Sequence, residues 1–93
     1  MSLEALTNKY IGSAEKVLKV LQKTQMPIAM TEVAMSDVLS WAANYLEDAK
    51  YYRAEGKLET SLTSVAYCEG LLDALRLLGA VKFEWPTSQE KER

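Results

Sequence analysis

Apolar residues recur every three or four positions at the start of the chain, which is the spacing of one face of an α-helix. Ser2 is a suitable N-cap, and Lys19 and Lys23 lie at the end where cations interact favourably with the helix dipole. The pattern predicts an amphipathic helix over residues 3–23. Its apolar stripe consists of Leu3, Leu6, Tyr10, Ile11, Ala14, Val17, Leu18 and Leu21.

A second and longer stripe follows Thr31, which is a reasonable N-cap, and continues to a turn at Gly56. Pro27 disfavours the helical conformation at Met26 and so separates this segment from the first helix. The pattern predicts a helix over residues 31–55. The stripe consists of Ala34, Met35, Val38, Leu39, Trp41, Ala42, Tyr45, Leu46, Ala49 and Tyr52.

A third helix is predicted over residues 58–79, from Leu58 to the helix-ending Gly79. Gly70 lies inside it, and because glycine weakens a helix interior, its presence predicts a close approach of a neighbouring helix. Short connections place consecutive helices antiparallel. The predicted fold is therefore all-α, an up-and-down three-helix bundle.

The residues after Gly79 change character. Phe83 and Trp85 alternate with charged residues in a short extended segment, and Pro86 opens a polar tail. We expect a single domain over residues 1–85 and a disordered tail over residues 86–93.

The third helix has apolar residues on two sides. Leu58, Leu62 and Val65 point one way, whereas Leu75 and its neighbours in the second half point largely the other way. Either this helix is central to the bundle, with Phe83 or Trp85 folding back onto it, or one stripe is exposed for self-association or a partner. Under the second interpretation the interface residues are Tyr67, Leu71, Leu78 and Trp85.

Charged residues continue the direction set by Leu58 and Leu62. Glu69, Asp73 and Arg76 follow it at helical spacing. Two carboxylates one turn apart can hold a divalent cation when a neighbouring helix adds a further carboxylate. The same trio can equally form an ion-pair set on the helix surface.

Composition excludes several classes of chemistry. The 93 residues contain no histidine, which removes Ser-His and Cys-His catalysis and the commonest metal ligand. The single Cys68 cannot form an internal disulfide and fits a reducing compartment. There is no long apolar run and no secretory signal at the start, so we expect a cytoplasmic protein. Because histidine and a cysteine pair are both missing, we expect no catalytic residues, no resident metal and no cofactor.

One basic stripe occurs, on the outer side of the first helix, where Lys9, Lys16 and Lys23 recur every seven residues beside Lys19. RNA binding along such a stripe generally includes aromatic or arginine contacts, and none interleaves here. With a net charge of −2 for the whole chain, nucleic acid is not an expected partner, and weak RNA binding stays a third option.

A set of aromatic, acidic, small and glycine positions recurs between Trp41 and Phe83: Ala42, Tyr45, Asp48, Ala49, Tyr51, Tyr52, Gly56, Tyr67, Gly70, Leu72, Asp73, Ala74 and Gly79. With these positions the segment resembles a small archaeal family of helical proteins of unknown function. The resemblance implies the same three-helix bundle and no reaction. It singles out Asp48 and Asp73 as acidic positions of the family pattern, which suggests a metal or small-ligand site around Asp48, Glu69 and Asp73 as the alternative function.

These patterns favour a small helical module that acts by protein–protein interaction or self-association, as in a homodimer, and that catalyses no reaction of its own. The partner itself is not identified by the sequence.

Overall fold

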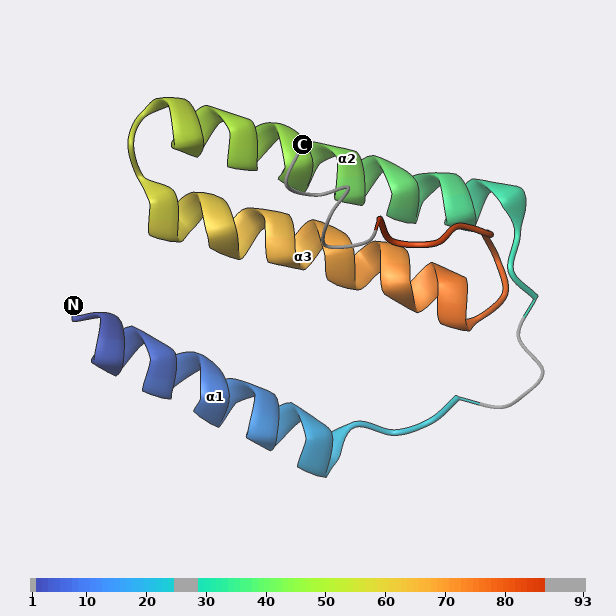
Figure 1. Cartoon of the computed structure of the whole chain (residues 1–93). Helices are drawn as coiled ribbons and strands as arrows, with labels where there is room; N and C mark the ends of the chain where they lie inside the picture. The colour runs from blue at the N-terminus through green and yellow to red at the C-terminus, as the bar shows by residue number, and fades with distance from the viewer. Residues whose placement is uncertain (1, 25–28, 87–93) are drawn as a thin grey trace.

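The computed structural model describes residues 2–24 and 29–86. It contains α1 (Leu3–Val20), α2 (Glu32–Ala54) and α3 (Leu58–Leu77), and no strand occurs within those ranges. The predicted all-α class with three helices is confirmed (Figure 1). The first helix ends three residues earlier than predicted, because Leu21 takes the extended conformation at φ −62° and ψ 146°.

The predicted N-caps are confirmed at the first two helices. The Ser2 hydroxyl accepts a hydrogen bond from the backbone N–H of Ala5 at 3.0 Å, and Thr31 Oγ1 accepts one from Ala34 at 3.0 Å. Each hydroxyl satisfies one N–H that has no partner within the helix. These local bonds explain why α1 and α2 begin where the sequence indicates.

Two glycines end the last two helices in the same way. Gly56 and Gly79 adopt the left-handed conformation, at φ 76° and 79°. In both cases the glycine N–H and the next N–H donate back to the last turn, to Arg53 and Tyr52 after α2 and to Arg76 and Leu75 after α3. This double hydrogen bond is the Schellman motif, which satisfies the final carbonyl groups of a helix.

Helices α2 and α3 form an antiparallel hairpin and are the one pair of helices that pack together in the described part of the chain (Figure 1). The seam between them contains the buried side chains of residues 2–24 and 29–86, which are Ala42, Ala49, Cys68 and Leu75. Ser61 Oγ donates to the carbonyl of Ala49 at 2.7 Å across this seam. The small alanines let the helices approach, and Leu75 fills the other half of the seam.

Gly70 does not serve the close approach that the sequence predicts. An added Cβ at Gly70 would meet no atom within 4 Å, and the residue is exposed. The seam is formed instead by the residues on the side of α3 that carries Cys68 and Leu75. The prediction for Gly70 is therefore wrong, and its glycine has no packing role in the hairpin.

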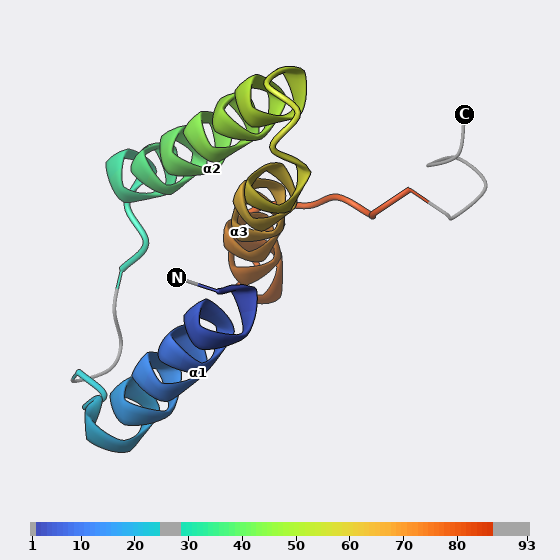
Figure 2. The ribbon, with the colours of Figure 1, turned by 90° about the vertical axis from the view of Figure 1, so that its left-hand side faces the viewer.

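Helix α1 lies apart from the hairpin (Figures 1 and 2). None of its residues is buried, and its large apolar side chains are exposed, from 37% at Leu6 to 73% at Leu18. The radius of gyration is 16.0 Å, against about 12 Å expected for a compact domain of this length. The apolar stripe of α1 is therefore present as predicted, but it has no partner in this structure.

The chain leaves α3 at Gly79 and continues as a non-helical segment over residues 80–86, as predicted. Figure 2 shows this C-terminal segment leaving on the side of α3 away from α1. The tail predicted to be disordered lies outside the described residues from position 87 onward. No described helix is both long and apolar enough to cross a membrane.

Candidate functional site

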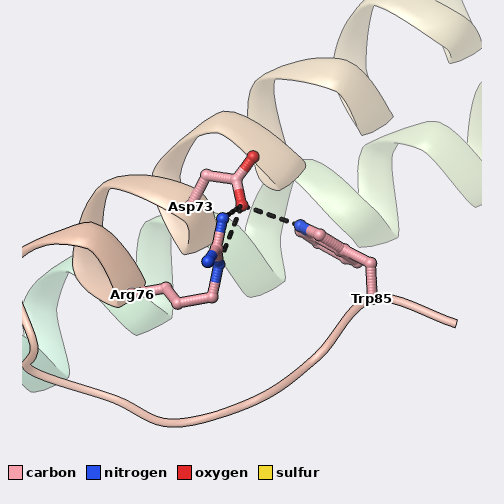
Figure 3. A network of polar contacts seen from close by, with 3 residues as sticks. All are labelled: Asp73, Arg76 and Trp85. Carbon is pink, nitrogen blue, oxygen red and sulfur yellow. Dashed lines mark hydrogen bonds and ion pairs between the residues drawn. The ribbon is translucent and has the colours of Figure 1, made fainter.

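The carboxylate of Asp73 is the centre of the most connected polar cluster. Its Oδ1 accepts a hydrogen bond from the indole Nε1 of Trp85 at 2.7 Å, and two from Arg76, from Nη2 at 3.2 Å and Nε at 3.3 Å. All three N–H groups converge on one oxygen (Figure 3). The ion-pair interpretation of Asp73 and Arg76 is thus what the structure shows.

This arrangement stabilises the charged form of Asp73. The indole hydrogen bond, followed by the hydrogen bonds and positive charge of Arg76, lowers the pKa of the Asp73 carboxyl below its usual value, and partial desolvation opposes the shift. The side chains of Asp73 and Arg76 are 41% and 39% exposed. Solvent screens an ion pair at such exposure, so the cluster positions the C-terminal segment more than it stabilises the fold.

The C-terminal segment folds back onto its own chain. The rings of Phe83 and Trp85 meet edge to face with centroids 4.9 Å apart, and the guanidinium of Arg76 lies 5.8 Å from the Phe83 ring centroid. This placement agrees with the interpretation in which Phe83 or Trp85 packs against the third helix.

The acidic residues proposed for a ligand site are not brought together. Ser61 contacts Ala49 across the seam, so Asp48 is level with Ser61, and Asp73 lies twelve residues, about 18 Å, further along α3. Asp48 and Glu69 are both exposed, and neither takes part in an ion pair within the described residues. No three His, Cys, Asp or Glu side chains in residues 2–24 and 29–86 are placed to hold a metal ion.

Cys68 is a free thiol at the seam and is 5% exposed. Desolvation by burial, and then the negative charge of Glu69, raise the pKa of this thiol. A raised pKa keeps the sulfur protonated and weakly nucleophilic. The residue therefore serves packing.

A continuous apolar surface follows one side of the hairpin, and we call it the apolar face. Two hollows along it share Val38. The first lies between the middles of α2 and α3, and the second continues to the end of the hairpin where α2 begins and α3 ends. The apolar face comprises Ala29, Met30, Ala34, Val38, Trp41, Tyr45, Tyr67, Leu71, Leu78, Gly79 and Ala80.

Aromatic rings bridge the two helices on this face. Tyr45 of α2 stacks on Tyr67 of α3 with ring centroids 4.5 Å apart, and Trp41 stacks on Tyr45 at 6.3 Å. Trp41 is 60% exposed, Tyr67 56% and Leu78 71%. Contiguous exposed apolar side chains of this size differ from the single apolar residues that scatter over any protein surface, and such patches occur at protein or membrane interaction sites and in ligand grooves.

The structure separates the four residues predicted as an interface. Tyr67, Leu71 and Leu78 lie together on the apolar face. Trp85 instead contacts Asp73, which is two residues after Leu71 and therefore about 200° around the helix from it. Trp85 thus belongs to the C-terminal segment on the other side of α3.

Sequence reasoning missed the part of the apolar face that α2 contributes. Val38, Trp41 and Tyr45 belong to the apolar stripe predicted for the second helix, but periodicity gives the direction of a stripe and not what covers it. The wide arc of that stripe was the available signal. An arc wider than one neighbour can cover leaves its flank exposed.

Lys9, Lys16 and Lys19 are exposed on α1, as expected for a solvated face, whereas Lys23 lies beyond the end of the helix at Val20 and so does not continue the predicted stripe. Lys9 Nζ lies 5.8 Å from the ring centroid of its neighbour Tyr10, an interaction within one helix. Nothing in this arrangement extends the basic stripe onto the hairpin, whose net charge over residues 32–77 is −4, from eight acidic and four basic residues.

A search of curated proteins and a search of solved structures found no significant match to this chain. A family model described as a protein of unknown function, DUF357, matches residues 9–81. The match runs from the first half of α1 through the C-terminal end of α3, and so includes all three helices. The chain therefore belongs to the DUF357 family of proteins of unknown function.

Proposed function

We propose that this chain is a non-catalytic interaction module that binds a protein through its apolar face. The observation that carries the proposal is the continuous run of exposed aromatic and aliphatic side chains across α2 and α3, centred on Trp41, Tyr67 and Leu78. Exposed tryptophan and tyrosine side chains supply large contact areas and dominate the energetics of many interfaces.

The small core supports the same proposal. The described part of the hairpin buries four residues, two of them alanines. A domain of this size buries only roughly 60–65% of the surface of its unfolded chain and is marginally stable, so each further buried side chain matters. Covering the apolar face would remove several large side chains from water, and each Å² of apolar surface so buried stabilises the protein by roughly 25 cal/mol.

The shape of the face suits an amphipathic helix as the bound element. The face is a shallow trough between two parallel ridges, the α2 side from Ala34 to Tyr45 and the α3 side from Tyr67 to Leu78. A helix laid in such a trough inserts apolar side chains at helical spacing. We also place the protein in a reducing compartment such as the cytoplasm, because its one cysteine is a buried free thiol.

The test compares captured proteins for matched bait variants. Tagged full-length chain is used to capture proteins from a lysate of the source organism that also contains untagged chain, and captured proteins are quantified by mass spectrometry. Leu78→Ser changes the apolar face. Leu77→Ser changes an equally exposed neighbour, at 76% against 71% exposure, about 100° away around the helix axis.

We expect Leu78→Ser to lose the captured proteins, the untagged chain included, and Leu77→Ser to retain them. Circular dichroism must show the same helicity for both variants. Equal capture by both variants would show that the apolar face is not the binding surface.

A further inference from the structure

The apolar stripe of α1 and the apolar face of the hairpin are both uncovered. At about 100° per residue, the centre of the stripe passes close to Leu3, Tyr10 and Val17, which are 60%, 63% and 57% exposed. Lys9 and Lys16 lie on the opposite side of the helix, and Lys23 follows its end at Val20. A helix of this kind is the element that the apolar face is shaped to receive.

The two surfaces agree in length. Eleven residues separate Ala34 from Tyr45, which is about 16 Å along α2. Met30 and Ala80 extend the face beyond that end by roughly another turn. The total of about 22 Å compares with about 27 Å for the 18 residues of α1.

The two surfaces also agree in charge. Residues 3–23 carry four lysines and two glutamates, a net charge of +2, whereas the hairpin over residues 32–77 carries −4. Because the lysines lie away from the stripe, docking the stripe leaves them in solvent. The opposite net charges favour the approach without placing a charge in the contact.

Helix α1 does not pack on its own hairpin. Within the described part of the chain, α2 and α3 are the pair of helices in contact, and α1 lies beside them without packing against either (Figures 1 and 2). Its exposed stripe is therefore available to another molecule.

We propose that the occupant of the apolar face is helix α1 of a second copy of this chain, docked reciprocally in a symmetric homodimer. The proposal rests on the proposed function of the apolar face and names its partner. One docked helix covers about 22 Å by 10 Å on each of two surfaces, roughly 440 Å² in total. Two reciprocal docks cover about 900 Å², close to the ~1,000 Å² at which specific interfaces begin.

The experiment is multi-angle light scattering on the full-length chain and its variants over a range of concentrations. The wild type is expected at twice the chain mass of 10.4 kDa. Val17→Ser in the stripe and Leu78→Ser in the apolar face are each expected to shift the mass to that of the monomer. The matched controls, Val20→Ser and Leu77→Ser, change exposed residues outside both surfaces and are expected to remain dimeric.

Mixing the two monomeric variants separates reciprocal exchange from other dimers. The Leu78→Ser chain still has an intact α1, and the Val17→Ser chain still has an intact apolar face. When the two are mixed, the intact α1 of the Leu78→Ser chain can bind the intact apolar face of the Val17→Ser chain. The mixture is expected to form a heterodimer through this one contact, and to need a higher protein concentration than the wild type because the second contact is lost. Neither variant forms a dimer alone at that concentration.

Three results would overturn the exchange. A wild type that stays monomeric at all concentrations shows that a second copy does not cover the face. A dimer that survives Val17→Ser and is lost in Leu78→Ser shows that two apolar faces pair directly, which refutes the role of α1 and leaves the proposed function standing. Monomeric variants that form no heterodimer when mixed show that the contact is not exchanged between chains.

Discussion

Leu75 is the largest fully buried side chain of the hairpin, at 2% exposure, so its truncation tests the packing of α2 against α3 directly. Leu75→Ala removes the equivalent of about three methylene groups from the seam, at about 0.8 kcal/mol each, or roughly 2.4 kcal/mol. A residual cavity adds to this, and Leu→Ala substitutions at well-packed sites lose about 2.7–5.0 kcal/mol. Because only two helices enclose the seam and can move together, we expect a loss of about 2.5–3 kcal/mol.

The assay is urea and thermal unfolding followed by circular dichroism at 222 nm, with all variants at one protein concentration, because self-association makes stability concentration-dependent. The loss corresponds to a fall in Tm of roughly 10–24 °C for a chain of this size. Leu77→Ala is the control, since the same side chain is removed two residues away at a position that is 76% exposed. It is expected to change stability by less than about 0.5 kcal/mol. Equal losses in the two variants would refute the assignment of Leu75 to the seam.

Two further predictions concern glycine and the C-terminal segment. Gly70→Ala is expected to raise the free energy of unfolding by about 0.5–1 kcal/mol, because an added Cβ there meets no atom within 4 Å. Gly56→Ala is expected to lower it by about 1 kcal/mol, because Gly56 has a φ of 76°. Thermal unfolding in which the two variants shift Tm in the same direction would contradict this expectation. Since the folded pKa of Asp73 lies below the unfolded value near 4, its contribution is present above pH 4 and is lost as the pH falls through the folded pKa. Trp41→Phe leaves Trp85 as the one tryptophan, and its fluorescence emission is expected to shift to the red below about pH 4. Asp73→Asn in the same background is expected to show part of that shift at pH 7. Emission that does not change down to pH 2 would contradict the contact between Trp85 and Asp73.

The Asp73 cluster illustrates a limit of reading charged patterns. The spacing of Glu69, Asp73 and Arg76 is compatible with a cation site and with surface ion pairs, because both use the same neighbouring positions on a helix. The structure pairs Asp73 with Arg76 and adds Trp85 as a third donor. That indole comes from a segment twelve residues away, and no helical periodicity could have placed it.

The helices themselves follow from local interactions that the sequence states directly. Serine and threonine hydroxyls at the N-caps, glycines at the left-handed positions and the spacing of apolar residues each act within a few residues of the chain. Ser2, Thr31, Gly56 and Gly79 accordingly mark the ends of the helices to within a few residues. The resemblance from Trp41 to Phe83 covers the later part of α2, the turn and α3.

The tertiary structure decided which apolar residues are covered. An apolar stripe on a helix indicates that this surface is removed from water in the folded protein or its complex. Which element covers it depends on contacts between residues distant in sequence, and those contacts follow from the packing of the whole chain. Here the seam selected Ala42, Ala49, Cys68 and Leu75, and it left the stripe of α1 and the aromatic flank around Trp41 in solvent. By itself the sequence determined three amphipathic helices and, to within a few residues, their ends, because these depend on bonds between residues close in sequence. Only the tertiary structure showed that α2 and α3 form the seam and that two apolar surfaces are left uncovered, because burial depends on which elements pack together.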